Sequence, residues 1–261
     1  MPIRVGGPLL GDGHGRFRIQ IVGNSGSGKS TVGHWLAARL NIPFIPLDEV
    51  FWRPGWKETP KEEFCAKVTD IMQTHQDGWI IDGDYPGSLE GLVSGAATDI
   101  IWLDPPLALY FPRVVFRTIL RLFSLAPPCS PGCREVWPEC VTRKGILWWC
   151  LTNHSVVRKR YSERVREWGV ENEGKLRRLG GWGSELRAWQ REVTVAVSCI
   201  KSRPGTLRVH DRAEQMFRLT RSFTPLRGPF NSSAPIRRQT GTSHPRFNSM
   251  GSSTKHTRSP R

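Results

Sequence analysis

The sequence predicts an α/β fold, in which a five-stranded parallel sheet is flanked by helices. Short apolar segments typical of buried strands alternate along the chain with amphipathic segments typical of helices. A glycine-rich turn joins the first strand to the first helix, and acidic residues follow three later strands. Each predicted element rests on its own local pattern.

Residues 16–22 alternate in polarity and then become apolar, which predicts the first strand. Residues 29–40 form a helix whose apolar side chains fall on one stripe: Val32, Trp35, Leu36 and Leu40. Residues 43–47 predict the second strand. The next predicted helix begins at Pro60, with Thr59 as its N-cap, and runs to about residue 76.

The same reasoning predicts the remaining elements: strands at 78–82, 99–103 and 207–210, and helices ending at 123 and spanning 141–168 and 212–219. Pro112 should start or kink the first of these helices. Four prolines between residues 124 and 138 predict a loop. The carboxyl ends of parallel strands form the ligand-binding edge of such a sheet. Four polar residues therefore point to one crevice: Asn24, Asp48, Asp82 and Asp104.

The turn after the first strand matches G-x-x-x-x-G-K-[ST], the P-loop of nucleotide-binding proteins. Glycines let the backbone N–H groups wrap a phosphate, and the helix N-terminus adds its positive dipole end. The predicted nucleotide-binding residues are Gly23, Asn24, Ser25, Gly26, Ser27, Gly28, Lys29, Ser30 and Thr31. Lys29 would reach the β- and γ-phosphates of ATP, and the Ser30 hydroxyl would bind Mg²⁺.

Two carboxylates are candidate site residues because each ends a strand. Asp82 sits where a P-loop protein places a carboxylate near the metal, and Asp48 sits similarly after the second strand. The alternative for both is a turn-capping role, which is common for Asp. Arg113, Arg117 and Arg121 are spaced by four residues and share one helix face, where they would stabilise charge on a transferred phosphoryl group. The alternative for these arginines is a solvated basic face.

Aromatic side chains flank Arg53 close to Asp48 in the sequence. Phe51, Trp52 and Trp56 would form either an acceptor pocket or a lid of packed rings. No motif in this region reads a particular base or sugar, so the acceptor remains open.

The last 41 residues, 221–261, contain eight Lys and Arg residues and no Asp or Glu. This composition predicts disorder. The net charge of +15 then falls to about +7 for the rest of the chain, which suits nucleoside phosphates as well as nucleic acid. The basic tail would contact nucleic acid or an anionic membrane, or it would be a solvated extension.

The six cysteines lack the two close C-x2-C pairs of a zinc ribbon. Cys129, Cys133 and Cys140, with His154 downstream, leave zinc as a minor alternative to free thiols. No apolar run approaches the roughly 20 residues that span a bilayer. The Gly-rich segment 1–15 has no apolar signal core, so a cytoplasmic protein that does not bind membranes is expected.

Two segments resemble the adenylate-kinase-related family called DNA topology modulation proteins. Residues 47–56, LDEVFWRPGW, resemble its LD-x-x-[FY]-W-x-P-G-W segment, and residues 79–85, WIIDGDY, resemble its W-I-x-D-G-N-Y segment. The resemblance covers about residues 16–220 and loosens after Trp149. This chain departs from the family by Asp84 in place of Asn, by an insert at about 163–203 and by the tail.

The resemblance implies a P-loop domain like the nucleoside monophosphate kinases at 16–220, with a mobile lid at about 124–140. Lys29 and Ser30 would handle ATP and Mg²⁺, and Asp82 would lie beside the metal. Asp48 and Arg53 would lie on the acceptor side, and Arg113, Arg117 and Arg121 would be lid-helix arginines.

The leading hypothesis is a kinase that transfers the γ-phosphoryl group of ATP to a small acceptor. The alternative is an ATP-binding regulatory or nucleic-acid-associated protein with little or no turnover. A GTPase switch is disfavoured because the N/T-K-x-D sequence that reads guanine is missing.

Overall fold

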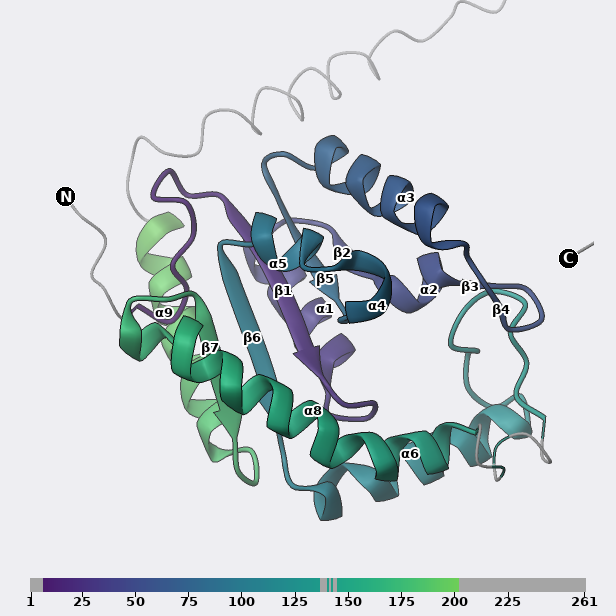
Figure 1. Ribbon diagram of the computed structural model, residues 1–261. Coiled ribbons are helices and arrows are strands. Elements are labelled where there is room, and N and C mark those ends of the chain that lie inside the picture. Colours follow the sequence, from purple (N-terminus) through teal and green to yellow (C-terminus); the bar gives the residue numbers. More distant parts are fainter. Residues whose placement is uncertain (1–6, 137–139, 141, 143–144, 202–261) are drawn as a thin grey trace, which may run out of the picture. The chain divides into compact units, whose positions relative to one another are not determined.

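The computed structural model describes residues 7–136, 140, 142 and 145–201, and the predicted α/β class is confirmed. A parallel five-stranded sheet has the order β2-β5-β1-β6-β7 (Figure 1). Its strands are β1 (Phe17–Gly23), β2 (Phe44–Pro46), β5 (Gly78–Asp82), β6 (Asp99–Asp104) and β7 (Leu176–Gly180). Two short strands, β3 (Trp52–Arg53) and β4 (Lys57–Glu58), form a separate antiparallel hairpin.

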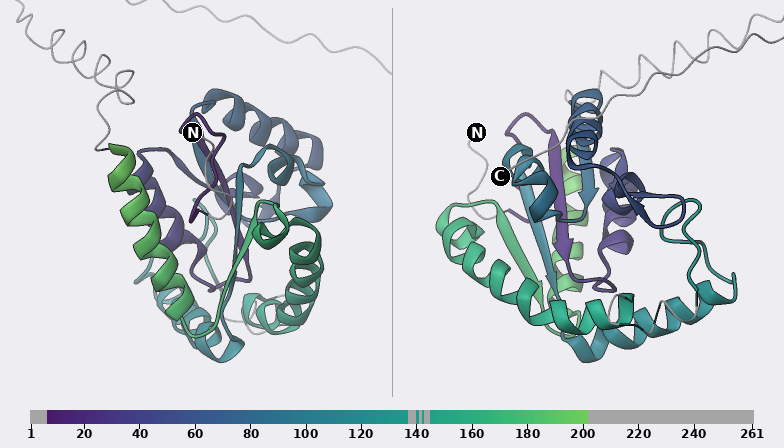
Figure 2. Two further views of the ribbon diagram at one scale, coloured as in Figure 1. Left: turned by 90° about the vertical axis from the view of Figure 1, so that its left-hand side faces the viewer. Right: turned by 45° about the vertical axis from the view of Figure 1, so that its right-hand side comes forward.

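Helices cover both faces of the sheet (Figure 2). One face carries α1 (Lys29–Leu40) and α9 (Ser184–Lys201). The other face carries α3 (Lys61–Thr74), α5 (Leu92–Ala96) and α8 (Ile146–Trp168). The remaining helical segments are α2 (Leu47–Phe51), α4 (Pro86–Leu89), α6 (Leu107–Leu122) and the 3₁₀ turn η1 (Val170–Asn172).

The core has two halves because successive side chains of a strand point to opposite faces. Along β1, Ile19 and Ile21 pack in the cluster that includes α1 and α9, whereas Val22 packs in the cluster that includes α3 and α8. All five residues of β5 and all six of β6 are buried. Burial on both faces explains why these strands are continuous apolar runs in the sequence.

The fifth strand lies elsewhere than predicted. It is β7, which falls inside the segment 163–203 that the sequence suggests is an insert, and it pairs with β6 along its whole length. Only Leu176 and Leu179 of its sequence LRRLG are large and apolar, so hydrophobicity does not mark it as a strand. The predicted strand 207–210, the helix 212–219 and the tail 221–261 lie outside the described residues.

The predicted start of one helix is corrected, and one of the two alternatives for Pro112 is excluded. The residue that caps α3 is Pro60, because the Thr59 side chain is buried and donates a hydrogen bond to the carbonyl oxygen of Val50 instead. The long helix α6 begins at Leu107, and Pro112 is its sixth residue and not its start. The predicted helix 29–40 is confirmed at both ends. None of the described helices is long and apolar enough to cross a bilayer.

Replacing Leu176 with alanine tests whether β7 belongs to the core. Leu176 is 1% exposed, and truncating such a side chain costs about 2–5 kcal/mol of unfolding free energy. The matched control is Val195→Ala on α9, where the side chain is 65% exposed. Urea unfolding should show a clear loss for the first variant only, and equal midpoints would contradict this placement of β7.

Candidate nucleotide-binding and phosphoryl-transfer site

The predicted P-loop forms a turn between β1 and α1 that only glycine fits at several points. Gly23, Gly26 and Gly28 have φ angles of +145°, +80° and +101°, a region that other residues rarely adopt. A Cβ atom on Gly26 would lie 2.3 Å from Cγ2 of Val114. Because these positions carry no side chain, the loop backbone can curve tightly just before the N-terminus of α1. Such a curve, with its N–H groups at a helix N-terminus, suits a phosphate.

Lys29 and Ser30 lie next to Asp82 at the end of β5. The Ser30 hydroxyl donates a hydrogen bond of 2.8 Å to Oδ2 of Asp82, and the Lys29 ammonium is 3.7 Å from Oδ1. The Lys29 Nζ atom also donates to the carbonyl oxygen of Asn24 at 3.4 Å. Three residues that the sequence assigns to one site thus meet there.

Asp82 is 7% exposed, and its burial raises the pKa of the carboxyl above the ordinary value. Lys29 and Ser30 lower this pKa, and the nearby Asp48 carboxylate raises it further. A buried carboxylate beside a hydroxyl supplies two hard oxygen atoms. Mg²⁺ is commonly held by one or two such protein ligands together with substrate phosphates, so Ser30 and Asp82 fit a magnesium site.

Asp48 lies in the first turn of α2 and is held from two directions. The Tyr85 hydroxyl donates a hydrogen bond to Oδ1, and the Cys129 thiol donates to Oδ2 at 3.6 Å. Burial and the Asp48 carboxylate raise the pKa of Tyr85, and the same two causes raise the pKa of Cys129 to about 11. Both partners therefore stay protonated and fix the orientation of the Asp48 carboxylate.

Of the three arginines predicted on one helix face, two turn inward. Arg117 donates a hydrogen bond of 2.9 Å from Nη2 to the hydroxyl of Ser25 in the P-loop. Its Nε atom is buried and has no hydrogen-bond partner among the described residues. Arg121 donates to the carbonyl oxygen of Pro127 and is 3.3 Å from Glu135. Arg113 is exposed on α6.

The orphaned Nε atom of Arg117 is informative because buried donors are nearly always paired. Burial, followed by the nearby Arg121, lowers the pKa of Arg117. An unpaired guanidinium donor beside the P-loop is the arrangement that an anionic ligand would complete. Arg121, by contrast, is already paired and ties α6 to the following loop.

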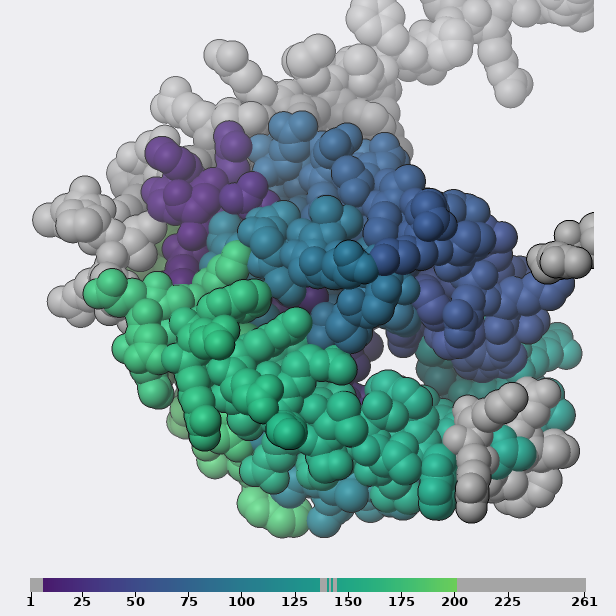
Figure 3. Space-filling view, in the orientation of Figure 1, coloured from purple at the N-terminus to yellow at the C-terminus, as the bar shows by residue number. Residues whose placement is uncertain are grey.

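The segment predicted as a lid rests on the β3–β4 hairpin in its described part, 124–136. The backbone N–H of Gly55 donates to the carbonyl oxygen of Gly132 at 3.1 Å. The Ser130 hydroxyl donates to Trp52, and the Trp56 indole N–H donates to Arg134, both at backbone carbonyls. The space-filling view is hollowed between the blue residues that include α2 and α3 and the green helix α8 (Figure 3).

Arg53 and the aromatic residues of this region pair largely with one another. Arg53 forms an ion pair with Glu63, which lies on α3. The rings of Phe51 and Trp52 pack edge to face with their centroids 4.9 Å apart, and Phe51 also packs against Tyr85. Arg53 is therefore paired with a protein carboxylate, and Phe51 packs against Tyr85, the residue that donates a hydrogen bond to Asp48.

Two other acidic residues near the site have structural partners. Asp104, at the predicted edge, accepts two hydrogen bonds from Arg178 of β7 and lies 3.4 Å from Arg158. Asp84 accepts a hydrogen bond from Tyr161 and lies 3.7 Å from Arg164, both on α8. These carboxylates hold β7 and α8 against the rest of the fold. Thr31, at the start of α1, is exposed.

The four residues considered for zinc have separate neighbours. Cys129 contacts Asp48, Cys133 donates to the backbone of Arg53, Cys140 lies against Glu135 and His154 contacts Tyr110. Within the described ranges, no group of three or more His, Cys, Asp or Glu residues is arranged to hold a metal ion.

Sequence reasoning missed Tyr85 and Cys129 as partners of Asp48, and Tyr110 and His154 as neighbours of the P-loop. Tyr85 ends the quoted WIIDGDY segment, which offers a signal for it. The other three come from segments far along the chain, and only the folded chain brings them to the site.

Comparisons with known proteins give a consistent picture. The shikimate kinase family model matches residues 25–69, from the P-loop through most of α3. A shikimate kinase of Persephonella marina is 33% identical over 116 residues, covering 36% of this chain and 65% of that protein. The chain thus spans slightly less than two thirds of this curated relative.

Solved structures resemble this chain more loosely. A sugar kinase of Janibacter has 15% identity and a TM-score of 0.42, and covers 73% of this chain and 98% of its own. A gluconokinase of Sinorhizobium meliloti has 15% identity and a TM-score of 0.39, and covers 78% of this chain and 99% of its own. Likeness at this level does not indicate a substrate.

Proposed function

We propose that this protein is an ATP-dependent kinase that transfers the γ-phosphoryl group to a small acceptor. The observation that carries the proposal is the meeting of Lys29, Ser30 and Asp82 at the end of a glycine-rich loop, with Asp48 beside them. The family match over 25–69 supports it, since that range contains Lys29, Ser30 and Asp48.

Each of these side chains has a definite role in phosphoryl transfer. The P-loop backbone and Lys29 bind the β- and γ-phosphates, and Ser30 and Asp82 would hold Mg²⁺, which neutralises charge on them. Arg117, through its unpaired Nε donor, stabilises negative charge on the transferred group. Catalysis is thus mainly positioning and charge stabilisation.

Asp48 faces the acceptor and takes its hydroxyl proton. The Tyr85 and Cys129 hydrogen bonds fix the orientation of the carboxylate, and each of its oxygens keeps a lone pair for the acceptor. The lid segment 124–136 covers this side from the hairpin and would exclude water, which would otherwise accept the phosphoryl group. Arg53 acts indirectly, by holding α3 through Glu63.

The finer family assignment is a further part of this proposal. The segments at 47–56 and 79–85 favour the adenylate-kinase-related DNA topology modulation family among P-loop kinases. Asp84, the residue that departs from the family pattern, follows β5 and accepts a hydrogen bond from Tyr161 of α8, so we assign it a structural role.

A second candidate function rests on the composition of residues 221–261. Eight basic residues and no acidic ones favour contacts with nucleic acid phosphates. Such binding would make the protein a nucleic-acid-associated ATP-binding protein. It would weaken steeply with salt, whereas phosphoryl transfer within the folded part would not depend on the tail.

The test is ATP consumption by the full chain with Mg²⁺ across a panel of acceptors that spans shikimate, gluconate, other polyols and nucleoside monophosphates. ADP formation should rise by at least tenfold over the acceptor-free rate with one class of acceptor. Tight ATP binding with no acceptor stimulation across the panel would contradict the kinase and favour the second candidate.

A further inference from the structure

The side chain of the second P-loop residue makes three hydrogen bonds to other parts of the protein. Asn24 is 5% exposed. Its Nδ2 atom donates to the Tyr110 hydroxyl and to the carbonyl oxygen of Cys150, both at 2.9 Å. Its Oδ1 atom accepts the backbone N–H of Ser25 at 2.8 Å. Asn24 therefore ties the loop backbone to α6 and α8 at once.

The chain of hydrogen bonds continues from Asn24 through Tyr110 to a histidine on α8. The Tyr110 oxygen lies 2.7 Å from Nδ1 of His154 on α8. That oxygen already accepts a hydrogen bond from Asn24, and its own proton can be donated to His154. Burial raises the pKa of Tyr110 to about 12, so the hydroxyl keeps this proton. In the tautomer that carries its proton on Nε2, His154 accepts this hydrogen bond at Nδ1.

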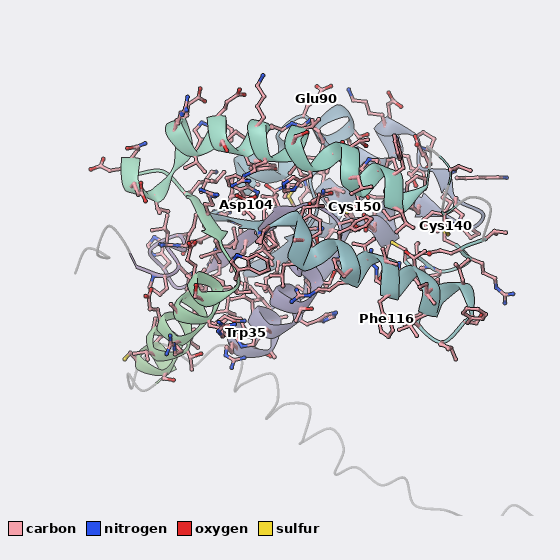
Figure 4. All side chains as sticks on the ribbon, turned by 90° about the horizontal axis from the view of Figure 1, so that it is seen from below. Trp35, Glu90, Asp104, Phe116, Cys140 and Cys150 are labelled. Carbon is pink, nitrogen blue, oxygen red and sulfur yellow. The ribbon has the colours of Figure 1, made fainter. Side chains whose placement is uncertain are left out.

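The same two helices contact the neighbouring loop residues. Arg117 of α6 binds the Ser25 hydroxyl, and Val114 of α6 lies against Gly26. The Cys150 thiol of α8 lies 3.8 Å from the carbonyl oxygen of Ser25. Figure 4 shows Cys150 between the two helices and Phe116 on the outer side of α6. Three successive loop residues are thus held from α6 and α8, which flank the lid.

We propose that Tyr110 and His154 are positioning residues for the phosphate-binding loop, acting through Asn24. This inference rests on the proposed function, because it assigns them an effect on ATP binding. A loop that is already held in its binding conformation loses less entropy when the phosphates bind. The His154 acceptor therefore strengthens ATP binding although His154 itself does not contact the nucleotide.

The role predicts which substitutions of His154 are tolerated. Asparagine can place a carbonyl oxygen near the position of Nδ1 and accept the Tyr110 proton, whereas leucine cannot. His154→Leu leaves the Tyr110 hydroxyl without its acceptor in a buried site, a defect that relaxes by moving Tyr110 or Asn24. Tyr110→Phe removes both hydrogen bonds and keeps the packed ring.

The experiment is calorimetric titration of the full chain with ATP and Mg²⁺, combined with thermal unfolding. The Kd for ATP should rise about 5- to 10-fold in His154→Leu and Tyr110→Phe, the size expected for one lost hydrogen bond. His154→Asn should restore most of the affinity. Thr152→Ala, an exposed position two residues away on α8, is the matched control and should bind like the wild type.

The outcomes separate this inference from the proposal on which it rests. A wild type that does not bind ATP would overturn the proposed function and the inference together. A wild type that binds ATP, with His154→Leu and Tyr110→Phe binding equally well, would overturn the inference alone. A lower melting temperature with unchanged Kd in both variants would also overturn the inference. It would show that the hydrogen bonds from Asn24 to His154 serve only the packing of α6 and α8.

Discussion

Replacing Lys29 with alanine is expected to reduce kcat/KM for acceptor-dependent ATP turnover by about 10²–10³-fold or more, the usual loss when one preorganised stabilising group is removed. The ammonium lies 3.7 Å from Asp82 and is the main cation that offsets the burial of this carboxylate. Its loss removes charge stabilisation from the transferred phosphoryl group and also leaves Asp82 without its cationic partner.

Steady-state rates measured beside a matched variant test this expectation. Lys159→Ala on α8 removes an exposed ammonium and should retain full activity. A Lys29→Ala protein that folds normally and turns over ATP within about threefold of the wild type would be incompatible with the assigned role.

The second large effect is expected at Asp48. Asp48→Asn keeps an oxygen atom that can accept the Tyr85 hydrogen bond but removes the carboxylate that takes the acceptor proton. Loss of a general base typically lowers the rate by about 10²–10⁴-fold. We therefore expect kcat to fall by that factor while the Kd for ATP stays close to the wild-type value.

The comparison variant is Asp70→Asn on α3, which makes the same chemical change at an exposed position. Single-turnover rates and ATP titrations on both proteins separate chemistry from nucleotide binding. Equal loss of ATP affinity and rate in Asp48→Asn would mean that Asp48 supports the nucleotide side of the site, contrary to the assignment.

The sequence predicts the elements whose formation depends on neighbouring residues, such as a glycine-rich turn before a helix or a continuous apolar strand. The helix at 29–40 begins where the glycines of the P-loop end and stops where Asn41 adopts a left-handed conformation. Strands β5 and β6 are buried on both faces and are therefore apolar throughout. In contrast, β7 contains two arginines in five residues. It forms a strand because it pairs with β6 and because Arg178 donates hydrogen bonds to Asp104.

In the candidate site, too, contiguous motifs are predictable from the sequence, whereas contacts between distant segments are not. The motif around Lys29 and Ser30 is contiguous, so its chemistry can be read from the sequence. Arg53 was expected on the acceptor side, but spacing alone does not show that Glu63 pairs with it. The contacts of His154 and Cys129 join residues 44 and 81 positions apart, and such contacts follow only from the tertiary fold.

Phosphoryl transfer to an acceptor is tested most directly by the fate of a labelled γ-phosphoryl group. The full chain is incubated with γ-labelled ATP, Mg²⁺ and the best acceptor of the panel, and the products are separated. We expect most of the label leaving ATP to be recovered on the acceptor, and we expect Lys29→Ala to transfer none. Label recovered only as inorganic phosphate, at a rate that the acceptor does not change, would contradict phosphoryl transfer to an acceptor.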